Sequence, residues 1–191
     1  MDRLHALFGQ RLDRAVAGEL KPLKLDAAKF HTEVEPLPEG QWSEAGQDRV
    51  EFRVSTNPGA PLAPLVKIAS GGELSRFILA LKVALAEQGG AATVIFDEID
   101  RGVGGATADA VGRRLSALAA EGQVLVVTHS PQVAALGAHH WRVEKQVAGE
   151  VTTSTVVALD PPAREGEIAR MLSGDTVTDE ARAAARALLE G

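Results

Sequence analysis

Three short groups of polar residues stand where the chain is expected to pass between loop, strand and helix. Residues 70–73 (Ser-Gly-Gly-Glu) enter a predicted helix, while Asp97-Glu98 and His129 each follow a short apolar run. A glycine-rich turn at a helix start offers N–H groups and a positive dipole end to an anion. Carboxylates at a strand end can hold Mg²⁺ and polarise a water molecule. Together these residue types predict phosphoryl-transfer chemistry.

Each group also has an ordinary structural interpretation when it is taken alone. The Ser-Gly-Gly-Glu turn can simply cap a helix, the two acids can cap the next helix, and a histidine after a strand is usually structural. The order of the groups argues for function instead. A phosphate-facing helix start and two strand ends fit one α/β sheet, in which ligands bind at the carboxyl ends of the strands.

The elements that must position these groups follow from the periodicity of the apolar residues. Helical spacing predicts helices over 4–20, from about 73 to Gly89-Gly90, and over 106–121, 163–173 and 178–189. Alternation predicts half-buried antiparallel strands at 29–35 and 50–54, and further strands are expected near 140–144 and 151–158. Loops rich in proline and glycine occupy 36–40 and 57–64.

Two continuous apolar runs, 93–96 and 124–127, are typical of strands buried on both faces of a parallel sheet. The helix predicted between them completes a βαβ unit, whose crossover is almost always right-handed. The fold class is therefore α/β.

Composition narrows the function classes. The 191 residues carry a formal charge of −6, which gives no electrostatic support for binding nucleic acid through the whole surface. The chain has no cysteine, so disulfides and thiolate metal sites are excluded. No apolar run approaches the roughly 18 residues that cross a bilayer, and the first residues lack the plan of a signal peptide. A cytoplasmic location is expected.

Four motifs, taken in order, resemble one family. They are residues 67–76 (KIASGGELSR), 96–105 (FDEIDRGVGG), 128–134 (THSPQVA) and 167–174 (EIARMLSG). The first three are similar to the signature motif, Walker B and switch histidine of ABC-type ATPases, and all four are similar to the RecN family of SMC-like ATPases. The resemblance runs from about residue 29 to the end. It implies the C-terminal lobe of an ABC/SMC-type P-loop ATPase head, with a mainly parallel core sheet flanked by helices and with antiparallel N-terminal strands.

The resemblance also implies a role for each matching residue. Asp97 would support Mg²⁺ directly or through water, Glu98 would be the general base, and His129 would sense the γ-phosphate of ATP. The turn that contacts ATP held by an opposing head would comprise Ser70, Gly71, Gly72 and Glu73. The loop between heads would comprise Asp100, Gly102, Gly104 and Gly105. Transporter and SMC relatives carry an aspartate where this chain has Gly104, so the contacts of that loop are not carried over in detail.

No Gly-x-x-x-x-Gly-Lys-Ser/Thr loop occurs in the sequence, so no cradle for the α- and β-phosphates is present. In SMC-like proteins that loop lies in the N-terminal half, beyond a coiled coil. We therefore expect residues 22–191 to form the C-terminal half of the head and residues 1–21 to be the root of the returning coiled-coil arm. An ordinary N-terminal helix packed on the domain is an equal alternative for 1–21. The expected partners are the N-terminal lobe, a second head and, by resemblance, DNA, and the isolated chain is expected to be inactive.

Two other functions remain open from the residues. A non-hydrolysing module for head association or coiled-coil anchoring would not need Asp97, Glu98 and His129 together. The ATPase lobe of a membrane transporter would favour aspartate at position 104 and a glutamine-rich signature. Gly104 and Glu73 disfavour the transporter interpretation.

Overall fold

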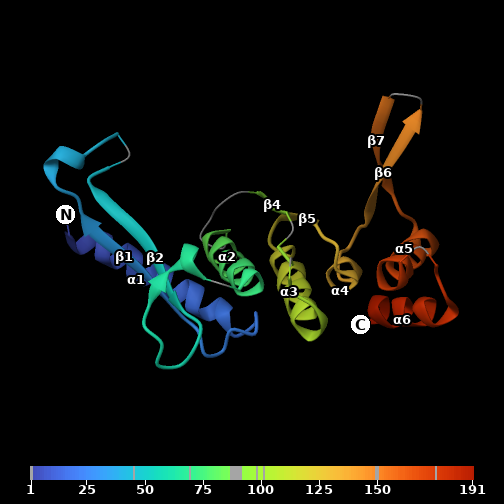
Figure 1. Cartoon of the computed structure of the whole chain (residues 1–191), viewed down its shortest axis with the longest axis horizontal. Coiled ribbons are helices and arrows are strands. Elements are labelled where there is room, and N and C mark those ends of the chain that lie inside the picture. Colours follow the sequence, from blue (N-terminus) through green and yellow to red (C-terminus); the bar gives the residue numbers. More distant parts are fainter. Residues whose placement is uncertain are drawn as a thin grey trace.

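The computed structural model describes residues 2–44, 46–68, 70–86, 92–97, 99–100, 102–148, 151–174 and 176–191. The elements follow one another along an elongated molecule, from α1, β1 and β2 at one end to α5 and α6 at the other (Figure 1). Within these ranges no helix is long and apolar enough to cross a membrane.

The helices are α1 Asp2–Leu20, α2 Gly71–Ala86, α3 Gly105–Leu118, α4 Pro131–Ala135, α5 Pro161–Ser173 and α6 Asp179–Glu190, with short 3-10 turns at Glu39–Gln41 and Leu65–Lys67. The strands are β1 Lys29–Pro36, β2 Asp48–Ser55, β3 Ala63–Pro64, β4 Thr93–Asp97, β5 Gln123–Val127, β6 Trp141–Ala148 and β7 Val151–Ala158. The predicted end of α2 at Gly89-Gly90 lies outside the described residues.

The N-terminal strands form an antiparallel sheet, as their alternation predicts. β1 pairs with β2 in a register that joins Phe30 to Val54, and both side chains are buried. The segment 57–64, predicted to be irregular, contributes the two-residue strand β3 at the other edge of β2. Prolines restrict this segment to a short edge strand, because a proline has no N–H to donate to a longer ladder.

The C-terminal half of α1 is part of the same core. Val16 and Leu20 are buried in the cluster that also holds β1, β2 and α2. Leu7 and Phe8, nearer the start of the helix, are 59% and 62% exposed. The helix therefore packs on the domain at its C-terminal end, and the role of residues 1–21 as the root of an arm stays a prediction.

One buried ion pair joins α1 to α3. The guanidinium of Arg114 donates two hydrogen bonds to the carboxylate of Glu19, and one of them measures 2.9 Å between Nη2 and Oε1. Glu19 is 8% exposed. Removing one member of a buried pair leaves an uncompensated charge, so the pair holds α1 in one place on the lobe.

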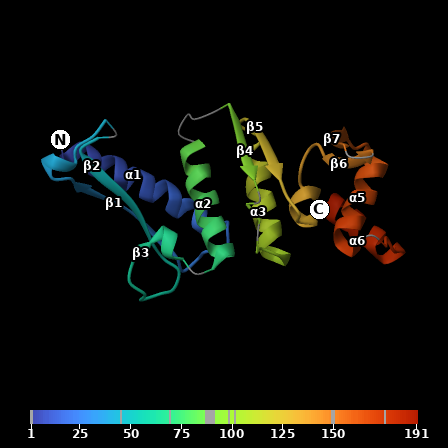
Figure 2. The same cartoon turned by 45° about the horizontal axis from the view of Figure 1, so that its top comes forward.

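The predicted βαβ unit is confirmed, because β4 and β5 pair in parallel with α3 between them along the chain. Phe96 is fully buried against the helices, in the cluster that contains Val111 and Leu115 of α3. Burial on both faces is wrong, however: Ile95 is 60% exposed and Val127 is 53% exposed. The described sheet has only these two strands, and Figure 2 shows the helices α2 and α3 beside it. A continuous apolar run reveals strand identity but not which elements cover it.

The C-terminal region is a hairpin on two helices. β6 and β7 pair antiparallel from Trp141 opposite Ala158 to Ala148 opposite Val151, and the hairpin projects from the body of the molecule (Figure 1). Helices α5 and α6 pack with α4 around a small second core centred on Ile168 and Ala185. Helix α4 was not predicted from the periodicity, because it is only five residues long.

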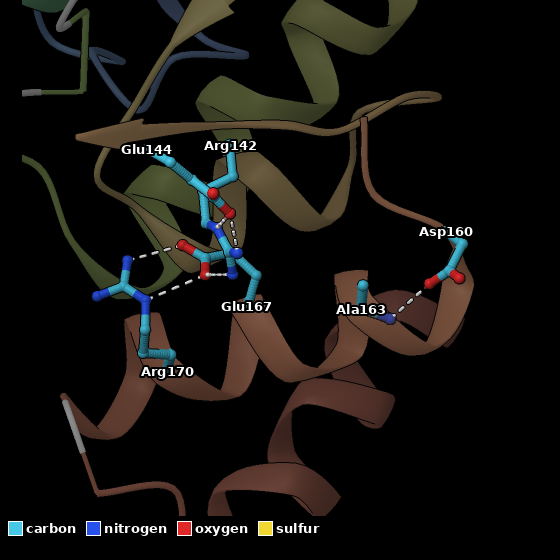
Figure 3. Close-up of polar contacts among 6 residues, drawn as sticks. All are labelled: Arg142, Glu144, Asp160, Ala163, Glu167 and Arg170. Atoms are coloured by element: carbon cyan, nitrogen blue, oxygen red, sulfur yellow. Dashed lines mark hydrogen bonds and ion pairs between the residues drawn. The ribbon is translucent and has the colours of Figure 1, made fainter. Parts of the chain in front are cut away.

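The carboxylate of Glu167 ties the hairpin to α5 through a cluster of charged side chains (Figure 3). Glu167 is 5% exposed and accepts from Arg170 at 2.7 Å and 3.0 Å and from Arg142 of β6 at 3.4 Å. Arg142 also pairs with Glu144 on the same strand. Hydrogen bonds from Arg170 lower the pKa of Glu167, with a smaller contribution from Arg142. An isolated hairpin is marginal in water, so this anchor matters for its placement.

Glu167 is therefore expected to make stability depend on pH. A carboxyl whose pKa is lowered on folding adds stability above its unfolded pKa of about 4.5, and that stability is lost as the pH falls through the lowered folded value. Glu167→Gln should lower the urea midpoint at pH 7 and flatten its decline towards pH 3. Exposed Glu121→Gln is the control and should leave the slope of the acid limb as in the parent. An unchanged acid limb in Glu167→Gln would contradict the assignment.

Candidate functional site

Ser70 lies directly before α2 and caps it. The N–H of Glu73 donates to Ser70 Oγ at 3.4 Å, and the N–H of Leu74 donates to the Ser70 carbonyl at 3.0 Å. Ser70 and Gly71 are exposed. A hydroxyl that accepts from the backbone keeps its own O–H to donate. The turn therefore presents a hydroxyl donor and the positive end of a helix to solvent, which suits an oxyanion.

Gly72 is held against the loop that follows β4. A Cβ built on Gly72 would lie 2.8 Å from the carbonyl oxygen of Gly102, which is closer than real Cβ contacts. Gly102 itself has φ +73°, a conformation that favours glycine. The N–H of Val103 donates to the Asp100 carbonyl at 2.9 Å and closes that loop as a turn. The two predicted motifs are thus in backbone contact.

Asp97 and His129 lie at the same edge of the parallel sheet. Asp97 is the last residue of β4 and is opposite Val127, the last residue of β5 in the paired register. His129 follows two residues later, and both side chains are exposed. Parallel strands place their carboxyl ends together, so the structure brings these two predicted residues to one edge. Glu98, the predicted general base, lies outside the described residues.

Asp100, which is expected in the loop between heads, has a buried side chain. Asp100 is 5% exposed, and its carboxylate accepts from the hydroxyl of Thr128 and from the N–H of Ser130 at 3.1 Å. A buried carboxylate needs such donors, because an unpaired one is costly. The side chain therefore points into the lobe, towards the turn that carries His129.

The remaining glycines of the loop lie at the surface and begin α3. Gly102, Gly104 and Gly105 are exposed, and Gly105 has φ +55°. Gly104 is the N-cap of α3, and its carbonyl accepts from the N–H of Thr107 at 3.2 Å. Glycine supplies no side chain to the cap, so the exposed loop presents its backbone to solvent.

The fit of a Mg²⁺ ion depends on Asp97. The described residues contain no group of three or more histidine, cysteine, aspartate or glutamate side chains that would enclose a metal ion. Mg²⁺ commonly keeps several waters and takes one or two carboxylates together with substrate phosphates. The exposed carboxylate of Asp97 at the strand end fits a Mg²⁺ site of this kind, in which the phosphates of a nucleotide and water supply the remaining ligands.

Thr128 and Ser130 are the functional neighbours that sequence reasoning missed. Both occur in a motif singled out for His129, but neither was assigned a role. The available signal was the sequence Thr-x-Ser-Pro, since Ser130 with Pro131 at the next position is typical of a helix start. Ser130 Oγ does accept from the N–H of Val133, at 3.4 Å, and so caps α4.

Comparison with known proteins gives the family context. No family model matches the chain. Curated relatives described as DNA repair protein RecN match it at 53% identity over 145 residues in Xylella fastidiosa strain Temecula1, 44% over 183 residues in Rickettsia felis and 41% over 191 residues in Vibrio cholerae. These alignments cover 76%, 96% and 98% of the chain. The resemblance to RecN is confirmed.

The chain spans only 26% to 34% of the length of these RecN relatives. Solved structures show its fold. A chain from work on ATP-driven dimerization and DNA-stimulated activation of SMC ATPases matches with a TM-score of 0.63 at 17% identity, covering 92% of this chain and all of that one. The Smc head bound to the C-winged helix domain of ScpA matches with a TM-score of 0.60 at 17% identity, over 84% of this chain and 46% of that one. The fold is that of an SMC ATPase head, in its α/β C-terminal lobe.

Gly72→Ala tests the contact between the two motifs. The new methyl group has to displace the Gly102 carbonyl, and such overpacking costs about 1–3 kcal/mol of unfolding free energy. Gly71→Ala is the matched control, because a Cβ there meets nothing within 4 Å, and it should be neutral or slightly stabilising. Urea unfolding of both variants measures the difference. Equal stabilities would contradict the close approach.

Proposed function

We propose that this chain is the C-terminal lobe of an SMC-like ATPase that binds and hydrolyses ATP between two heads during recombinational repair of DNA double-strand breaks. The observation that carries the proposal is the pairing of β4 with β5, which puts exposed Asp97 and His129 at one sheet edge. The similarity to RecN supplies the repair context, and it applies to about a third of those proteins.

The residues divide between two nucleotides. Asp97 would ligate a Mg²⁺ ion that neutralises phosphate charge, Glu98 would take a proton from the attacking water, and His129 would donate a hydrogen bond to a γ-phosphate oxygen. All three serve ATP bound to their own head. The hydroxyl of Ser70 and the start of α2 would face the γ-phosphate of ATP held by the opposing head. The support is that Ser70 and Gly71 are exposed, so the hydroxyl and the helix start are accessible to a ligand from another head.

The proposal requires partners. The sequence has no Walker A loop, so the α- and β-phosphates must be held by the N-terminal lobe of the same protein. A second copy of the head would complete each ATP site, and DNA would be the substrate of repair. The proposed location is the cytoplasm, at the nucleoid. The isolated 191-residue chain is proposed to have no ATPase activity.

Glu98→Gln tests the assignment of the base. In a full-length RecN protein that carries this segment, the amide cannot accept the proton of the attacking water. We expect ATP turnover to fall about 10²-fold or more, as for loss of a general base, while ATP binding is retained. The measurement is phosphate release with parallel binding of labelled ATP. Turnover at the parent rate would remove Glu98 from the mechanism.

Ser70→Arg tests the contact across the heads and separates the ATPase from a non-hydrolysing module. The long side chain fills the exposed space before α2, where the phosphate of the opposing head is proposed to lie. ATP-dependent dimerisation, followed by analytical ultracentrifugation, should be lost, while ATP binding to a single head stays. Ser70→Ala is the smaller control and should weaken dimerisation less. Normal dimerisation of Ser70→Arg would rule out an interface at this turn.

A further inference from the structure

We propose that Asp100 is a positioning residue that links the Ser70–Gly72 turn to His129. Contact of that turn with ATP held by the opposing head would then change the position of His129, which serves ATP on its own head. The coupling between ATP sites in this inference rests on the proposed function. Its structural part stands on the contacts among three segments: residues 70–72, Asp100 with residues 102–103, and residues 128–130.

The first step is the burial of the Asp100 carboxylate. It is 5% exposed, and the donors around it are the Thr128 hydroxyl and the Ser130 N–H. Hydrogen bonds to an ionised carboxylate are roughly twice as strong as neutral ones. A carboxylate removed from water holds its donors firmly, because losing them leaves a buried charge.

The second step is what those donors carry. Thr128 and Ser130 flank His129, and the Ser130 N–H also donates to Thr128 Oγ1 at 2.9 Å. Ser130 is fixed on its other side, because its Oγ caps α4. The backbone on both sides of His129 is therefore held by one carboxylate and one helix start. Asp100 therefore acts on His129 through the two residues that flank it.

The third step joins Asp100 to the phosphate-facing turn. Its carbonyl accepts from the N–H of Val103 at 2.9 Å, which ties these two residues together. Gly102, next to Val103, lies close to the Ser70–Gly72 turn. A Cβ built on Gly72 would be 2.8 Å from the Gly102 carbonyl oxygen. A movement of the Ser70–Gly72 turn therefore presses on Gly102 and its neighbour Val103. Val103 is hydrogen-bonded to Asp100, whose carboxylate holds the His129 segment.

Packed turns transmit such a movement because close-packed atoms do not absorb it. Linkage makes the effect reciprocal: if phosphate at the Ser70 turn shifts the His129 segment, ATP at His129 shifts the affinity of the Ser70 turn by the same factor. The two ATP sites of a head pair would be coupled within one lobe.

The experiment uses the ¹⁵N-labelled 191-residue chain, with hydrogen exchange of the Ser130 amide and the ring signals of His129 as readouts. Thr128→Val removes the hydroxyl at nearly constant volume, and Asp100→Asn removes the charge. Both should speed Ser130 exchange about tenfold or more and move the His129 signals. Thr128→Ser restores the hydroxyl and should return both readouts towards the parent. Gly72→Ala should move the Ser130 and His129 signals from a distance, while Gly71→Ala should not.

Unchanged Ser130 exchange in Thr128→Val would overturn the positioning role, even if Asp100→Asn unfolds the chain. Equal effects of Gly72→Ala and Gly71→Ala on His129 would overturn the link between the turns. Turnover is measured separately in the full-length protein, where Thr128→Val should lower kcat with little change in KM and Thr128→Ser should recover it. If that parent protein fails to hydrolyse ATP, the proposed function fails while the exchange results still decide the positioning role.

Discussion

The close approach of Gly72 to Gly102 is the constraint on which the arrangement of the site depends. Only a residue without a side chain lets the start of α2 meet the turn after β4. That meeting sets where the Ser70 hydroxyl lies relative to the strand ends that carry Asp97 and His129. The parallel pairing of β4 and β5 then fixes the position of Asp97 relative to His129, since it brings both strand ends to one edge of the sheet. Backbone geometry, more than side-chain bonding, assembles this site.

Much of the fold follows from local patterns in the sequence. The helix predicted over 4–20, and the alternation of Phe30 and Val54 in two strands, are confirmed because each pattern reflects one local element. The open face at Ile95 was not predictable in this way. The sequence of a strand shows which residues are apolar, but whether they are buried depends on elements from other parts of the chain that pack on the sheet.

The candidate site was predictable in its residue types and less so in its geometry. The order of the motifs placed Asp97 and His129 correctly at neighbouring strand ends. Asp100 was assigned to the loop between heads, which stays a prediction, and the burial of its side chain was not foreseen. Its direction depends on a turn of four residues, and sequence patterns do not report which way a turn points its side chains. The donors Thr128 and Ser130 were invisible for the same reason, since they become partners only through the fold.

The ion pair between Glu19 and Arg114 has a consequence for the order in which the lobe assembles. Its members are separated by 95 positions, so α1 leaves the ribosome long before the residue that neutralises its glutamate. Closing so long a loop early is entropically unfavourable, and contacts between distant positions form slowly. Helix α1 can thus pack on β1 and α2 before α3 is made, whereas its ion pair with Arg114 closes only after α3 is in place.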